Sequence, residues 1–95
     1  MVVGMGQIVF RIHQCGSLKA KRKVVKAIVA RIQNHFNASV AEVADNDIYQ
    51  RAVIGVSIVG SDRRVINAKL DKLFNFAEDL GLAEMIDTQL EIISV

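Results

Sequence analysis

The chain has 95 residues, of which 52% are apolar and 23% charged, and its formal net charge is +2. This length fits one domain, residues 1–95, that can bury a core without disulfides or metal, and the absence of proline and of low-complexity tracts excludes a disordered chain. A single cysteine excludes an intrachain disulfide, no apolar run is long enough to cross a membrane, and the N-terminus lacks the features of a signal peptide. We therefore expect a cytoplasmic protein.

The N-terminal half of the chain predicts a strand, a helix and a second, weaker strand. Residues 2–13 alternate between apolar and polar side chains, a period of two that is typical of a strand. Ser17 is a suitable N-cap for a helix that runs to about Phe36, and residues 39–44 predict the second strand. The helix is amphipathic because apolar residues recur at helical spacing along one stripe. This stripe consists of Leu18, Val25, Val29, Ile32 and Phe36.

The C-terminal half predicts a strand, a helix and a final strand. Residues 45–47 have the composition of a turn, and residues 51–59 form the next predicted strand. Ser61 or Asp62 caps a second amphipathic helix, which ends before a glycine at position 81. Residues 86–95 predict the last strand.

The order of elements is therefore β-α-β-β-α-β, which favours an α+β sandwich of the ferredoxin-like type, with a four-stranded antiparallel sheet and two helices on one face. The opposite sheet face is too apolar for water and too polar for a core, so we expect a second copy of the chain to cover it in a homodimer. The alternative is an exposed face without a partner. The residues on this face are Val3, Met5, Gln7, Val9, Arg11, Val53, Ser57, Val59, Asp87, Gln89 and Glu91.

Charge is distributed unevenly along the chain. Residues 1–41 contain seven basic and no acidic residues, whereas residues 42–95 contain five basic and ten acidic residues. Such asymmetry indicates a polyanionic partner, because binding responds to the local potential rather than to the net charge.

The basic residues concentrate at the start of the first predicted helix. Helical spacing places Lys19, Lys23 and Lys26 on one face, and we expect Lys21 and Arg22 to flank the apolar stripe and extend outward. The helix dipole disfavours cations at this end, and such local conflicts tend to mark functional sites. We therefore expect phosphate or nucleic-acid binding; the alternatives are a solvated basic face or an acidic protein partner. The expected anion-binding residues are Ser17, Lys19, Lys21, Arg22, Lys23, Lys26 and Arg51.

An RNA partner would be bound through its backbone and shape. The predicted sheet has no exposed aromatic residues for base stacking, and the GXXG loop of a KH domain is absent. Tyr49 either borders the basic surface or caps the hairpin, and the sequence leaves both interpretations open.

Catalytic and metal sites are weakly supported by the sequence. Cys15 and His13 lack a positioned base or further ligands, and Asp45 and Asp47 are too few for a calcium loop. The loop after the first strand lacks the arginine by which acylphosphatases of this architecture bind phosphate. We expect no enzymatic activity, cofactor or metal; the least favoured alternative is a small phosphoester- or anion-binding enzyme that uses Lys19 and the helix N-terminus.

Three segments together resemble the YlxP-like family of small bacterial proteins: SLKAKRKVVK at residues 17–26, FNASVAEV at 36–43 and YQRA at 49–52. The resemblance spans nearly the whole chain and implies a ferredoxin-like fold. The family is a domain of unknown function whose genes often lie beside those of translation and ribosome-maturation factors, which implies association with RNA or the ribosome. A tyrosine stands at position 49, where tryptophan is commoner in the family. The motif positions are Ser17, Leu18, Lys19, Lys21, Arg22, Glu42, Gln50 and Arg51.

Overall fold

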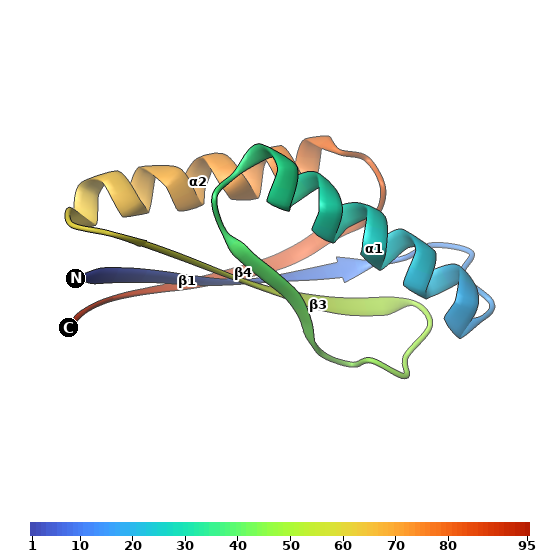
Figure 1. Cartoon of the computed structure of the whole chain (residues 1–95). Coiled ribbons are helices and arrows are strands. Elements are labelled where there is room, and N and C mark those ends of the chain that lie inside the picture. The colour runs from blue at the N-terminus through green and yellow to red at the C-terminus, as the bar shows by residue number, and fades with distance from the viewer.

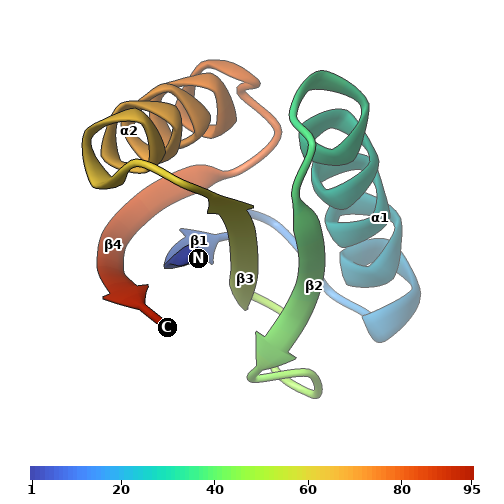
Figure 2. The same cartoon turned by 60° about the vertical axis from the view of Figure 1, so that its left-hand side comes forward.

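A computed structural model describes all 95 residues and confirms the predicted order of elements. Both helices cover one face of a single antiparallel sheet, whose strand order is β2-β3-β1-β4 (Figures 1 and 2). This is the predicted ferredoxin-like sandwich. The elements are β1 (Val2–Arg11), α1 (Leu18–His35), β2 (Ser39–Ala44), β3 (Arg51–Gly60), α2 (Arg63–Asp79) and β4 (Glu84–Ser94).

The helices begin and end at residues that satisfy their free backbone groups. The Ser17 hydroxyl accepts a hydrogen bond from the Ala20 amide at 3.1 Å and caps α1. Of the two candidate caps for α2, the structure selects Asp62, whose carboxylate accepts hydrogen bonds from the amides of Arg64 and Val65. Gly81 follows α2 with φ +67°, a conformation that glycine adopts without strain.

The hydrophobic core lies between the helices and the sheet. β1 and β3 supply its floor through alternate residues, and α2 packs closely above β1. A Cβ atom at Gly4 would collide with Ile66 of α2, and one at Gly6 would collide with the ring of Phe74, so glycine at these two positions permits the close approach. Neither helix is apolar over a length that could span a membrane.

The apolar face of α1 differs from the predicted stripe. Its buried residues are Lys21, Val25, Ile28 and Ile32, while Leu18, Val29 and Phe36 are only half-buried. The helix is therefore rotated about its axis relative to the prediction, because packing against β2 and α2 favours Ile28, which the predicted stripe omitted.

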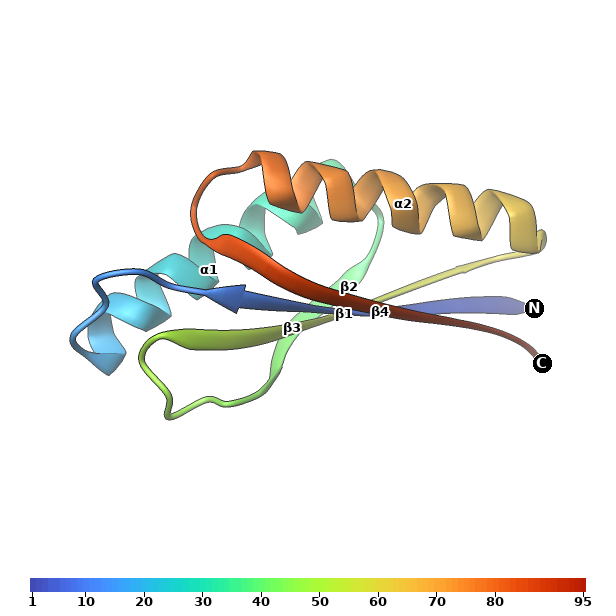
Figure 3. The same cartoon turned by 180° about the vertical axis from the view of Figure 1, so that it is seen from behind.

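No element covers the sheet face opposite the helices (Figures 1 and 3). The register places all the residues predicted for this face on it, with Met5 between Ser57 and Glu91 as one example. Val53 differs from the prediction: it was expected to be exposed on this face, but only 6% of its surface is exposed. Its register partners are Val9 in β1 and Ala44 in β2, so β1 and β2 enclose it on both sides.

The two termini lie at the opposite end of the molecule from the start of α1 and the β2–β3 loop (Figure 3). Met1 and Val95 are joined by backbone hydrogen bonds of 2.8 Å. The start of α1 and the loop between β2 and β3 lie together at the other end (Figure 3). This end contains all three sequence segments that carry the resemblance described above, at least in part.

Candidate nucleic-acid interface

The outer surface of α1 is basic from Lys19 to Arg31, and α1 contains no acidic residue. All of its cations but one are exposed, and none of the exposed ones makes an ion pair. We call this surface the α1 basic face. It consists of Lys19, Arg22, Lys23, Lys26 and Arg31.

Helical geometry separates the α1 basic face from the core. Lys19, Lys23 and Lys26 lie four and three residues apart, on the side of the helix opposite Val25 and Ile28. Ala27 and Ala30 continue this side of the helix, so no bulky neighbour there covers the ammonium groups. Arg31 lies one to two turns beyond Lys26 and was not among the expected binding residues, although its position on the same helix is evident from the sequence.

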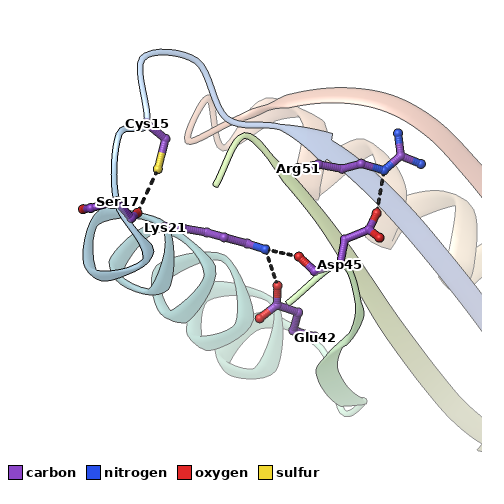
Figure 4. Close-up of polar contacts among 6 residues, drawn as sticks. All are labelled: Cys15, Ser17, Lys21, Glu42, Asp45 and Arg51. Carbon is purple, nitrogen blue, oxygen red and sulfur yellow. Dashed lines mark hydrogen bonds and ion pairs between the residues drawn. The ribbon is translucent and has the colours of Figure 1, made fainter. Parts of the chain in front are cut away.

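The prediction that Lys21 extends outward is wrong. Lys21 is 1% exposed and points beneath the helix toward β2 (Figure 4). Its Nζ lies 3.0 Å from Oε2 of Glu42 and donates a hydrogen bond to the backbone carbonyl of Asp45. Glu42 Oε2 is itself buried without a hydrogen bond, so the Lys21 charge is what compensates it.

The reason for this burial is the rotation of α1. Lys21 stands four residues before Val25 and seven before Ile28, so it belongs to the buried face of the helix. A lysine at that position can be buried only if charged and polar partners meet it inside. Residues of β2 and of the turn that follows provide them. Lys21 is consequently unavailable to a phosphate group.

Two other expected binding residues also have internal partners. Ser17 is the N-cap of α1, and its hydroxyl is engaged with the Ala20 amide. Arg51 donates from Nε to Oδ2 of Asp45 at 2.7 Å (Figure 4). Its register partner is Arg11, whose side chain lies on the open sheet face, so Arg51 is separated from the α1 basic face.

Five of the eight motif positions take part in polar contacts between the start of α1, the loop before it and the β2–β3 hairpin: Ser17, Lys21, Glu42, Gln50 and Arg51. Gln50 donates from its side chain to the Cys15 carbonyl at 2.9 Å, and its own carbonyl accepts from the Ile12 amide. The Cys15 thiol lies 3.5 Å from the Ser17 carbonyl, to which it donates. Together with Lys21 these contacts hold the hairpin against α1.

The sequence analysis did not detect these contacts, and one signal could have revealed them. A lysine in helical phase with three apolar residues indicates a buried cation that needs a carboxylate elsewhere in the chain. Two charged residues of the motifs, Lys19 and Arg22, form no ion pair within the chain. Tyr49 is 40% exposed in the hairpin loop.

The surface around the start of α1 carries exposed cations rather than one of the main hollows of the molecule. The main hollows of the molecular surface lie on the open sheet face and beside α2, away from residues 13–19. His13 contacts Glu84 at 3.2 Å. No three His, Cys, Asp or Glu side chains are close enough to hold a metal ion.

Comparison with known proteins identifies the family and confirms the predicted resemblance. The family described as "Protein of unknown function (DUF503)" matches residues 3–90. The uncharacterised protein YlxP of Bacillus subtilis is 33% identical over 90 residues, which cover 95% of this chain and 98% of that protein.

Solved structures with a similar arrangement have low sequence identity. SnoaB, a cofactor-independent oxygenase from Streptomyces nogalater, is 13% identical with a TM-score of 0.49, over 99% of this chain and 92% of that one. A NIPSNAP family protein from Agrobacterium tumefaciens is 16% identical with a TM-score of 0.43, over the same shares of the two chains. Neither likeness informs function. The family match and the relative in B. subtilis show that this chain belongs to the YlxP-like family of unknown function, DUF503.

Proposed function

We propose that this protein is a non-enzymatic RNA-binding protein, associated with the ribosome or its RNA, that grips phosphate groups through the α1 basic face. The observation that carries the proposal is the set of five exposed cations on one helix, none of which has an acidic partner in the chain. Unpaired cations that the fold does not use remain available to an external polyanion.

The mode of binding follows from the residue types. Lysine and arginine contacts to phosphates release counterions and contribute affinity without reading sequence. The exposed sheet face carries no aromatic residue on which a base could stack. Recognition therefore depends on the path of the RNA backbone, and affinity falls steeply with salt.

Co-sedimentation with separated ribosomal subunits across a salt series tests the proposal. Three to five phosphate contacts give a log–log slope of roughly −2 to −4. The variant Lys19→Glu/Lys23→Glu/Lys26→Glu should not bind. A matched control, Arg64→Glu/Lys69→Glu/Lys72→Glu, changes the net charge equally on α2 and should retain most of the binding.

The two variants separate a located site from a general charge effect. If both variants lose ribosome binding equally, net charge alone drives the binding. Binding that survives reversal on α1 removes the α1 basic face from the interface. Failure of the unaltered protein to bind either subunit at any salt contradicts the proposed function itself.

A second candidate function is supported by a different part of the molecule. The open sheet face exposes Val59 at 63% and Met5 at 37%, and no element of the chain covers them. We propose that the protein also acts as an interaction module that self-associates through this face. Light scattering tests this proposal, and a strict monomer at high concentration contradicts it. The two functions are compatible because they use opposite sides of the molecule.

A further inference from the structure

Tyr49 is the one tyrosine of the chain, and it is more exposed than any of the four phenylalanines, which lie in or against the core. Its side chain is 40% exposed in the loop between β2 and β3. The aromatic contacts of the molecule join His35, Phe36 and Phe76, so the Tyr49 ring stacks on no other ring. Its hydroxyl makes no hydrogen bond within the chain. Both the ring face and the hydroxyl are therefore available to a ligand.

Contacts with distant segments hold the backbone on both sides of Tyr49. Before it, the Asp45 carbonyl accepts a hydrogen bond from the Lys21 ammonium group (Figure 4). After it, Gln50 donates from its side chain to the Cys15 carbonyl at 2.9 Å. The loop therefore presents the ring from a fixed position, which reduces the conformational entropy lost when a ligand contacts it.

The same contacts place the ring beside the start of α1. Cys15 lies two residues before the N-cap Ser17 and four residues before Lys19 of the α1 basic face. Figures 1, 2 and 3 all show the β2–β3 loop next to the first turns of α1. An RNA strand whose phosphates contact Lys19 therefore passes close to Tyr49.

The composition of the loop fits a base better than a phosphate. Ile48, next to Tyr49, is apolar and 45% exposed. The loop also carries two carboxylates, and Arg51 compensates that of Asp45 but not that of Asp47. The free carboxylate repels phosphates, whereas every base has a π-face that can stack on an aromatic ring. The loop is therefore suited to the bases of a strand whose phosphates lie on α1.

We propose that the RNA bound by the α1 basic face contains an unpaired nucleotide, whose base stacks on the ring of Tyr49. This inference rests on the proposed function and specifies the class of RNA. Inside a paired stem each base is already stacked between its neighbours, so the base must come from a single strand, a loop or a bulge. The phosphate contacts supply affinity, and Tyr49 supplies the preference for unpaired RNA.

Tyrosine fluorescence tests the stacking contact, because the chain contains no tryptophan and Tyr49 is its only tyrosine. Titration at low salt with a single-stranded oligouridine of about ten nucleotides should quench the fluorescence, since a base stacked on the ring quenches its emission. The same oligouridine paired with oligoadenosine should bind through its phosphates and leave the emission nearly unchanged. A free tyrosine amide in matched solutions corrects for the light that the RNA absorbs.

Substitutions in the loop separate stacking from a general apolar contact. Tyr49→Ala should weaken oligouridine binding about fivefold or more, the lower end of what a stacked base contributes, and duplex binding less than about twofold. Tyr49→Phe keeps the ring and should bind oligouridine within about twofold of the unaltered protein. Ile48→Ala, the matched control, removes an apolar side chain without a ring and should leave oligouridine binding unchanged. Thermal denaturation checks that each variant is folded.

The outcomes for the inference and for the proposed function are distinct. Quenching by oligouridine, together with a selective loss of oligouridine binding in Tyr49→Ala, supports the inference. Oligouridine that binds without quenching, or that binds Tyr49→Ala as tightly as the unaltered protein, overturns the stacking contact and leaves the proposed function intact.

Two further results overturn the inference in other ways. A loss in Tyr49→Ala that is equal for oligouridine and duplex removes the preference for unpaired RNA, and an equal loss in Ile48→Ala replaces stacking by apolar contact. Failure of the unaltered protein to bind oligouridine overturns the inference as well, and co-sedimentation with ribosomal subunits then decides the proposed function independently.

Discussion

The two helices pack on the sheet in the same way but differ in charge. α1 and α2 have 18 and 17 residues, cover the same sheet face and are each capped by a polar side chain. α1 carries six basic and no acidic residues, whereas α2 carries four basic and three acidic residues. Because α2 packs without a charge excess, the excess on α1 is not a requirement of the fold.

The helices also differ on their buried sides. The buried residues of α2 are all apolar, whereas those of α1 include Lys21. The charge of α1 is therefore of two kinds, one cation that holds the hairpin in place and five that face solvent. The predictions below separate these two kinds.

The largest expected effect on stability comes from the buried cation. Lys21→Ala leaves Glu42 buried without its counter-charge, and we expect a loss of about 3–5 kcal/mol in the free energy of unfolding. Lys23→Ala, on the outer side of the same helix, should change it by less than about 0.5 kcal/mol. Urea denaturation measures both. A similar small effect for the two variants would show that the Lys21–Glu42 pair does not stabilise the fold.

The exposed cations should affect binding and not stability. We expect Lys19→Glu/Lys23→Glu/Lys26→Glu to weaken RNA binding at least 100-fold, about 2.7 kcal/mol, at low salt. Since position 19 lies in the first turn of α1, where the helix dipole favours an acid, the free energy of unfolding should be unchanged or higher by up to about 1 kcal/mol. Filter binding and thermal denaturation check the two effects. Equal falls in affinity and stability would mean that this surface supports the fold.

The caps of the two helices should have comparable, intermediate effects. Ser17→Ala and Asp62→Ala each remove an acceptor for helix amides and should cost about 1 kcal/mol of stability. RNA affinity at a temperature well below unfolding should change less than about twofold in both variants. A large and selective loss of affinity in Ser17→Ala would place the Ser17 hydroxyl in the binding site.

The smallest effect is expected for Arg51, which is half-exposed and paired with Asp45. Arg51→Ala should lower stability by no more than about 1 kcal/mol, because partly exposed ion pairs contribute little. Its effect on RNA affinity should be clearly smaller than that of Lys23→Ala. A comparable loss measured in the same binding assay would extend the interface from α1 onto the sheet.

Sequence reasoning predicted the local features of this protein well. The strand periodicity, the cap at Ser17 and the glycine after α2 depend on a few neighbouring residues, and each is found in the structure. The order of elements and the rules of connection then allowed few folds, so the sheet and the side covered by helices were also predictable. The basic character of α1 was evident from the same neighbouring residues.

Contacts between distant segments were not predictable from the sequence. Glu42 and Asp45 lie 21 and 24 residues after Lys21, and only the folded hairpin brings them to its ammonium group. The rotation of α1, which decides whether a lysine faces core or solvent, results from packing against β2 and α2. The placing of Arg51 beside Arg11 on the open face likewise depends on strand register. The sequence by itself determined the elements and the charge of α1, whose causes are local; tertiary packing decided which of those charges remain free.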